Sequence, residues 1–157
     1  MKIIAALSLA ALLTISILAQ QPARNPAPAG PPEVTTITAA DLAAIIAKQP
    51  SDRNGSQAFI RLAPYSVNME HRVVSQAAAV HEHEAELFCV IEGAGTIVTG
   101  GKLVTNPGGN TIQGGVSRRI SKGDFVLVPE GVPHQIPNVE GNLTVMTLHL
   151  PRAAASN

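Results

Sequence analysis

Residues 123–138 read GDFVLVPEGVPHQIPN, in which Gly, Pro, Gly, His and Asn follow the spacing G-x5-P-x-G-x2-H-x3-N. The apolar run 125–128 predicts a strand that ends at Pro129, since proline lacks an amide hydrogen and fixes φ. Gly131 can adopt a positive φ, so Pro129 and Gly131 together predict a tight turn. This turn places His134 on the following strand, where its imidazole can point into a β-structure.

The chain after residue 57 has the same β character. Short runs rich in Val, Ile, Leu, Phe and Thr alternate with clusters of Gly, Pro and Asn, as is typical of strands and turns. We expect strands at residues 58–62, 67–76, 79–83, 86–92, 95–99, 118–120, 125–129, 134–136 and 143–150. Residues 99–115 contain several glycines and predict a long hairpin or a flexible loop. The pattern as a whole indicates an all-β fold, an antiparallel barrel or sandwich.

One short helix is expected before the strands. Thr38 can cap its first turn, and Asp41 three residues later completes a capping box. The apolar residues 42–47 and Lys48 follow, and Pro50 ends the helix.

A second polar block lies upstream of the opening stretch and reads HEHEAE. Residues two apart on a strand face the same side, so His81 and His83 are expected to share a face. Imidazole and carboxylate groups suit divalent first-row metals, so these histidines together with Glu86 indicate a metal site. Glu82 and Glu84 alternate with the histidines and are expected to face away, although one that turned inward could act as a general base.

Together the two blocks resemble the two halves of the cupin motif, and the similarity runs from about residue 58 to residue 151. The resemblance implies a single-domain cupin, a small antiparallel β-barrel or jelly roll that holds one divalent transition metal (Fe, Mn, Zn, Ni, Co or Cu). It also implies His134 as a ligand. Glu86 is implied as well, because Gly93 follows it after six residues as in the family pattern. Cupins often form dimers, so a homodimer is expected.

The first block departs from the family pattern, in which two histidines one residue apart are followed by three or four residues and then Glu. In one register His81 and His83 are both ligands, and the connection to Glu86 is one residue short. In the other register His81 takes the second histidine position, Ala79 stands at the first, and His83 lies in the turn. The candidate metal ligands are therefore His81, His83, Glu86 and His134. His71 and His149 could line the pocket, but each is interpreted as a core or surface histidine.

Composition excludes some classes of partner. The chain has 157 residues with 11 basic and 11 acidic side chains and no basic run, so nucleic-acid binding is not expected. Three Phe, one Tyr and no Trp also argue against base-stacking surfaces. The single cysteine, Cys89, lies in an apolar run and is interpreted as a small buried hydrophobic residue. A reactive thiol is the alternative.

The N-terminal segment resembles a secretory signal peptide, since Lys2 is followed by seventeen uncharged residues. We expect a signal peptide at residues 1–19, a Pro- and Ala-rich linker at 20–36, the cupin domain at 37–152 and a tail at 153–157. The mature protein is then periplasmic or secreted, of a bacterial type, without a stable membrane domain. An uncleaved signal anchor is the alternative.

Three classes of function are compatible with these features. A metal with open positions could support oxygenation or Lewis-acid isomerase or lyase chemistry on a small molecule. A non-catalytic module could bind a metal or a small ligand in the same barrel. A structural role in oligomer contacts is the third class. The motifs indicate the site, and the fold by itself does not choose among these functions.

Overall fold

The computed structural model describes residues 34–152. The signal peptide expected at residues 1–19, residues 20–33 of the expected linker and the tail expected at 153–157 lie outside the described residues. Within residues 34–152, no helix is both long enough and apolar enough to cross a membrane.

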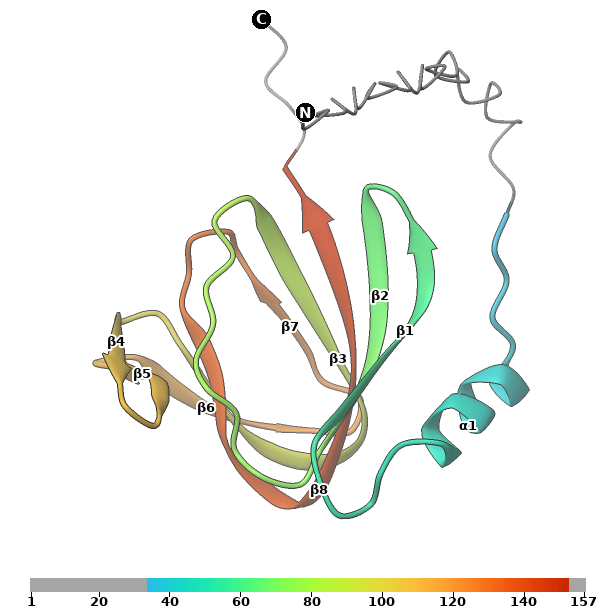
Figure 1. Ribbon diagram of the computed structural model, residues 1–157, viewed down its shortest axis with the longest axis horizontal. Helices are drawn as coiled ribbons and strands as arrows, with labels where there is room; N and C mark the ends of the chain where they lie inside the picture. The colour runs from blue at the N-terminus through green and yellow to red at the C-terminus, as the bar shows by residue number, and fades with distance from the viewer. Residues whose placement is uncertain (1–33, 153–157) are drawn as a thin grey trace, which may run out of the picture. The chain divides into compact units, whose positions relative to one another are not determined.

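The described residues form one short helix and eight strands (Figure 1). Their bounds are α1 Ala39–Ala47, β1 Gly55–Leu62, β2 Tyr65–Arg72, β3 Glu84–Thr99, β4 Lys102–Asn106, β5 Gly109–Gln113, β6 Val116–Ser121, β7 Phe125–Val128 and β8 His134–Pro151. The main sheet is antiparallel, with the order β1-β2-β8-β3-β6, and β7 also pairs with β3. β4 and β5 form a separate hairpin at the edge of the barrel. The all-β antiparallel fold is confirmed.

The two longest strands, β3 and β8, curl around a common interior. They pair from Glu84↔Pro151 at one end to Thr99↔His134 at the other. The second edge of β3 pairs with β7 over residues 86–89 and with β6 over residues 94–99. Three register irregularities between β3 and β8 bend both strands. One continuous strand therefore contributes to both halves of the barrel.

The expected capping box begins α1. Thr38 Oγ1 accepts a hydrogen bond from the amide of Asp41 at 3.2 Å, and the Asp41 carboxylate accepts one from the amide of Thr38 at 2.9 Å. The helix ends at Ala47, shortly before Pro50. The expected short N-terminal helix is thus confirmed.

Two pairs of expected strands are continuous in the structure. Residues 86–92 and 95–99 both belong to β3, and residues 134–136 and 143–150 both belong to β8. The glycine positions that suggest breaks are bulged corners, where the ladder shifts register and then continues. The segment 99–115 contains the hairpin β4–β5. Of the two expected forms, a long hairpin or a flexible loop, the structure has the hairpin.

The strand expected at residues 79–83 is wrong. This segment forms a single isolated bridge, Ala79↔His134, and bends at residues 82 and 83 before β3 begins. The carbonyl of His81 accepts a hydrogen bond from the amide of Gly131, so the segment crosses to the β7–β8 turn and does not run along a neighbouring strand. The strand expected at 67–76 is also too long, since β2 ends at Arg72.

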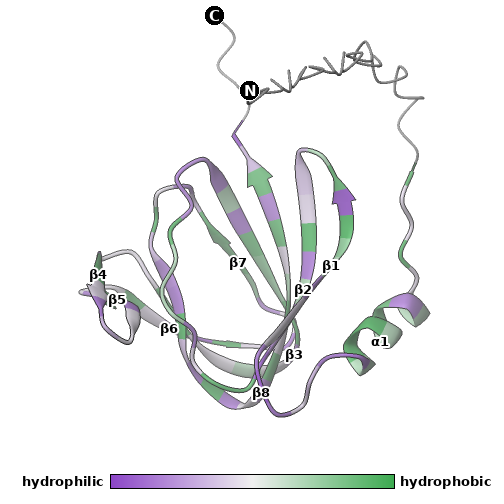
Figure 2. Ribbon diagram, in the orientation of Figure 1, coloured by the Kyte–Doolittle hydropathy of each residue, from purple (hydrophilic) through white to green (hydrophobic). Residues whose placement is uncertain are grey.

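The barrel interior is apolar, with a polar end. Its core consists of Phe88, Val90, Ile97, Ile120, Val128, Ile136, Leu143 and Val145. Hydrophobic and hydrophilic residues alternate along the strands in Figure 2, as expected where successive side chains face opposite sides. On β3 the inward row continues from Phe88 to the buried carboxylate of Glu86. The polar end of the interior therefore begins at Glu86.

Gly93 at a corner of β3 cannot be replaced without strain. Its φ is +80°, and an added Cβ would lie 2.0 Å from the carbonyl oxygen of Asn142 on β8. Gly93→Ala is expected to lower the free energy of unfolding by more than about 3 kcal/mol, because backbone strain and a steric clash add. Urea denaturation measures this change.

Gly123→Ala is the matched control for this prediction. Gly123 has φ +91°, but nothing lies within 4 Å of an added Cβ. It should lose only the backbone contribution of about 1–2 kcal/mol. Equal losses in the two variants would contradict the role of the close approach between β3 and β8.

Candidate metal centre

Three polar side chains from distant parts of the sequence meet at the polar end of the barrel. His81 comes from the segment between β2 and β3, Glu86 from β3, and His134 from the first position of β8. Each offers one atom suited to metal binding, and these atoms lie within 4.8 Å of one another. The structure thus brings together three of the four residues expected as ligands.

Glu86 lies at the centre of this group. Its Oε2 is 3.1 Å from Nε2 of His81 and 3.0 Å from Nε2 of His134. The Glu86 side chain is 5% exposed and that of His134 is 9% exposed, whereas that of His81 is 30% exposed. The group is therefore closed on the side of Glu86 and reachable from solvent at His81.

A backbone carbonyl orients His134. Its Nδ1 lies 3.4 Å from the carbonyl oxygen of Val132, which can only accept a hydrogen bond, so Nδ1 carries the hydrogen. Nε2 then faces Glu86 as a lone pair when the imidazole is neutral. The ring also meets the edge of Phe88, with centroids 5.6 Å apart. Both contacts limit the rotation of the His134 side chain.

The three neighbouring imidazoles decide the ionisation of Glu86. Burial is the largest single effect on the pKa of its carboxyl, and by itself it would raise that pKa. When His134 is protonated, it donates a hydrogen bond from Nε2 to Glu86. This hydrogen bond and the positive charges of protonated His134, His149 and His81 outweigh burial and lower the pKa below its ordinary value of 4.5. The carboxylate form of Glu86 is therefore the favoured form in this environment.

His149 on β8 also reaches this group, which agrees with the alternative that it lines the pocket and differs from its interpretation as a core or surface histidine. Its Nδ1 lies 2.7 Å from Oε1 of Glu84, and its Nε2 lies 3.7 Å from Oε1 of Glu86. Glu84 also lies 3.7 Å from His81, so it faces the site, and the expectation that it faces away is wrong. His81, Glu84 and His149 form a second group of candidate ligand atoms.

His83 does not join these side chains. It is exposed and belongs to neither group of candidate ligand atoms in residues 34–152. Because the backbone bends at residues 82 and 83, His83 does not share a strand face with His81. The three converging residues are those of the register in which Ala79 stands at the first histidine position. Their binding of a metal stays a prediction.

Backbone hydrogen bonds tie the two histidine-bearing segments together. Ala79 and His134 exchange two hydrogen bonds of 2.9 Å, and the amide of Gly131 donates to the carbonyl of His81 at 2.8 Å. Gly131 has φ +71°, as the sequence suggested for this turn. The backbones that carry His81 and His134 are thus fixed relative to each other.

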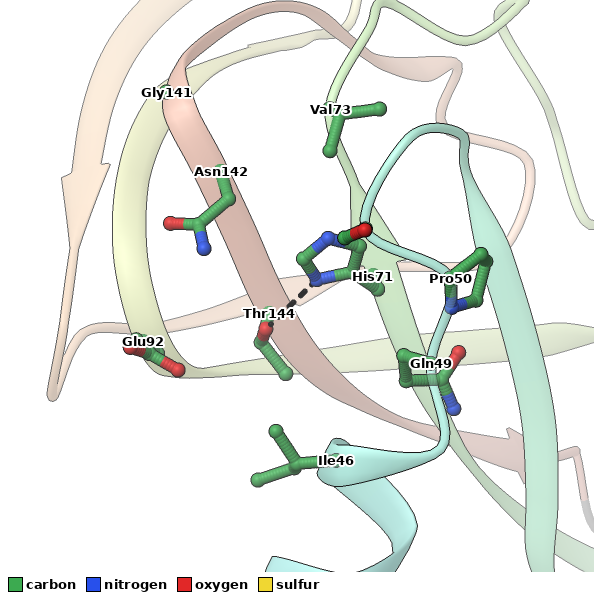
Figure 3. Close-up of a pocket in the computed structure, with 10 residues that line it drawn as sticks. Ile46, Gln49, Pro50, His71, Val73, Glu92, Gly141, Asn142 and Thr144 are labelled. Carbon is green, nitrogen blue, oxygen red and sulfur yellow. Dashed lines mark hydrogen bonds between the residues drawn. The ribbon is translucent and has the colours of Figure 1, made fainter.

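The cavities within residues 34–152 include two that matter for the histidines. One of about 30 Å³ lies beside His134 and is also lined by Arg72, Gln76, Ala77, Ala79, Phe88, Gln135 and Ile136. The other, of about 440 Å³, is shown in Figure 3 and includes residues from the end of α1, from β2 and from β8. His71 lies in it, with Nδ1 3.3 Å from Thr144 Oγ1, and none of the candidate ligands lines it. His71 is buried, so its interpretation as a core histidine is confirmed.

Cys89 takes no part in either group. Its side chain is buried, and burial raises the pKa of its thiol. A protonated, buried thiol is a weak nucleophile, which agrees with the interpretation of Cys89 as a small buried hydrophobic residue.

The residues of the site fit a divalent transition metal. Two atoms bound to one metal at about 2.0–2.1 Å lie about 3 Å apart, and the two nitrogens nearest Glu86 Oε2 are 3.0 and 3.1 Å from it. Two imidazoles and a carboxylate suit several first-row metals. The chemistry and spacing of these atoms are therefore compatible with a metal at this position.

The lowered pKa of Glu86 predicts how stability depends on pH without metal. A carboxyl whose pKa is lower in the folded chain than in the unfolded chain stabilises the folded state. This stabilisation is complete above the unfolded pKa and is lost as the pH falls through the folded pKa. The loss of unfolding free energy in Glu86→Gln should therefore be larger at about pH 6 than at about pH 3. Urea denaturation in a chelator measures it, with exposed Glu82→Gln as control. A constant loss at both pH values would contradict the prediction.

Comparison with known proteins identifies the fold. No curated protein matches the chain. Similar solved structures include the TT1209 protein of Thermus thermophilus, at 16% identity and TM-score 0.55, covering 72% of this chain and 96% of that one. Protein NMB1881 of Neisseria meningitidis has 16% identity and TM-score 0.53, with 74% and 99% covered. KdgF from a Halomonas species has 18% identity and TM-score 0.50, with 64% and 80% covered.

At sequence identities this low, the similarity to these structures shows a shared fold and nothing more. The family model described as cupin domain matches residues 66–150, which include β3, nearly all of β8 and all the candidate ligands. Since this match spans more than half of the 157 residues, the chain belongs to the cupin family.

Proposed function

We propose that this protein binds one divalent transition metal through His81, Glu86 and His134 and acts on a small molecule beside it. The observation that carries this proposal is the convergence of two imidazole nitrogens on one buried carboxylate oxygen, at 3.0 and 3.1 Å. Burying a carboxylate is costly unless it is paired or coordinates a metal. A metal would compensate the charge of Glu86 and use the lone pairs of both histidines.

The ligand set restricts the metal to a class. Imidazole nitrogen and carboxylate oxygen suit Fe, Mn, Co, Ni, Cu and Zn. When bound, such a metal supplies Lewis-acid polarisation of a substrate oxygen or, for redox-active ions, one-electron and O2 chemistry. The residues of the chain hold the site, bury the side chains of Glu86 and His134 and leave the site open on the side of His81.

The shape of the site favours a small ligand that approaches from solvent. The cavity beside His134 has a volume of about 30 Å³, room for one or two water-sized molecules. Phe88 and Ile136 form apolar parts of its wall. A larger substrate would therefore reach the metal from the exposed edge of His81, with only a small group entering the cavity.

A non-catalytic module that binds a metal or a small molecule is the second candidate function. His149 favours it, because its Nε2 lies 3.7 Å from Glu86 and could add a protein ligand. Export to the periplasm or medium and assembly as a homodimer are part of both candidates as predictions from the sequence.

Metal content of single-histidine variants tests the site. His81→Ala should abolish stoichiometric metal binding, because it removes one of the three converging ligands. His83→Ala is the matched control and should retain bound metal, since its side chain is exposed and outside the candidate groups. Elemental analysis of each purified protein gives the metal per chain. Equal loss in both variants would contradict the proposed ligand set, and metal-free wild type after incubation with each ion would reject metal binding.

The enzymatic candidate is tested separately. The metal-loaded protein is screened for O2 uptake with small phenols, diketones and sulfur acids, and for isomerase or lyase turnover without O2. We expect turnover that disappears in Glu86→Gln and persists in His83→Ala. Stoichiometric metal binding without turnover or ligand-dependent activity would favour the non-catalytic module.

A further inference from the structure

We propose that His149 is a fourth protein ligand of this metal site and that Glu84 holds it in the ligating orientation. This inference rests on the proposed metal-binding function and goes beyond it, because it assigns a ligand outside the two sequence blocks that resemble the family motif. It changes the proposed set from two imidazoles and one carboxylate to three imidazoles and one carboxylate.

The pairing of β3 with β8 places His149 at the site. Glu86 and His149 are direct cross-strand partners, so their side chains project to the same face of the sheet. The next residues on this face are Phe88 and Thr147, which are also paired and fully buried. The side chain of His149 is 17% exposed and thus lies mostly within the polar end of the barrel.

The hydrogen bond to Glu84 selects the tautomer of His149. A carboxylate only accepts, so Nδ1 at 2.7 Å from Glu84 Oε1 carries the hydrogen. In the neutral ring Nε2 then presents a lone pair toward Oε1 of Glu86, 3.7 Å away. Two acceptors that face each other need either a proton or a metal ion between them. Histidine ligands of metals usually donate their other nitrogen to a carboxylate or a carbonyl in this way.

His134 shows the same arrangement with a different partner. Its Nδ1 lies 3.4 Å from the Val132 carbonyl, and its Nε2 faces the other oxygen of Glu86. His134 and His149 thus approach the two oxygens of one carboxylate, each with Nδ1 held by an acceptor. The repetition of this arrangement at two independent positions distinguishes it from a casual surface ion pair.

The spacing of the rings agrees with a shared metal. Imidazoles bound to one metal at about 2.1 Å with tetrahedral angles have centroids about 5 Å apart. The His81 ring lies 5.3 Å from the His134 ring and 5.1 Å from the His149 ring. His81 therefore lies between the other two rings and belongs to both groups of candidate ligand atoms.

Charge and composition also agree with this assignment. Glu84 and Glu86 together carry the two negative charges that would neutralise a divalent ion. Ala79, at the position where the family pattern has a histidine, has no ligand atom and uses its backbone to pair with His134. His149 supplies the missing imidazole from another strand. Four protein ligands would fill a tetrahedral shell, so water or a substrate would bind by expanding the coordination number to five.

A count of bound imidazoles tests the proposal directly. The purified full chain is stripped with a chelator and loaded with Cu²⁺, and pulsed EPR counts the coordinated imidazoles. We expect three in wild type and two in His149→Ala. Chelator competition should show affinity for Zn²⁺ weakened by more than about 100-fold in His149→Ala. His71→Ala is the matched control, a buried histidine outside the site, and should leave the count and the affinity unchanged.

Glu84→Gln tests the positioning role without removing the ring. It should keep three bound imidazoles and weaken Zn²⁺ binding by about 10–100-fold, the usual effect of losing a carboxylate partner of a ligating histidine. This variant decides the question even if His149→Ala fails to fold. An affinity equal to that of wild type would overturn the role of Glu84.

The outcomes separate this inference from the proposed function. Two coordinated imidazoles in wild type, unchanged in His149→Ala, would overturn the assignment of His149 and leave the site of His81, Glu86 and His134 intact. Wild type that binds neither Cu²⁺ nor Zn²⁺ would overturn both.

Discussion

The antiparallel pairing of β3 with β8 is the constraint on which the other features of the molecule depend. It runs from Glu84↔Pro151 to Thr99↔His134, so each strand supplies both ends of the barrel. The same register sets Glu86 beside His149 and Phe88 beside Thr147 on one inward face. A slip of one residue would turn every inward side chain outward. The core and the candidate metal centre are therefore specified by one set of backbone hydrogen bonds.

The polar end of the barrel is built around a charge that the interior would otherwise disfavour. Glu86 is nearly fully buried, and its neighbours outweigh the effect of burial on its pKa. Three imidazoles surround its two oxygens. The Nδ1 atoms of two of them, His134 and His149, are held by the Val132 carbonyl and the Glu84 carboxylate. The arrangement directs nitrogen atoms inward, so a metal ion at this position would compete with protons for the same lone pairs. Acid should therefore release a bound metal.

Local sequence patterns predicted the parts of this structure that depend on local geometry. The strand, the turn with Gly131 at positive φ and the strand that starts at His134 all follow from residues 123–138. The capping box at Thr38 is likewise local. The strand expected at residues 79–83 fails because its hydrogen bonds go to the distant β7–β8 turn. The alternation of histidine with glutamate could not reveal that bend.

His149 shows the limit of reading candidate ligands from motifs. Its place depends on the register between β3 and β8, two strands far apart in sequence, and no short motif surrounds it. In the structure, steps of two along β8 lead from the buried Leu143, Val145 and Thr147 to His149. That pattern places His149 on the inward face but cannot say which residue of β3 it meets.

The hydrogen bonds that join residues 79–81 to the β7–β8 turn have a consequence for how this chain can change in length. His81 and His134 are attached to backbones that hold each other through Ala79 and Gly131. An added or deleted residue in either segment would shift one imidazole relative to the other and break these hydrogen bonds. The lengths of both segments are therefore constrained by the site as much as the identities of its side chains are.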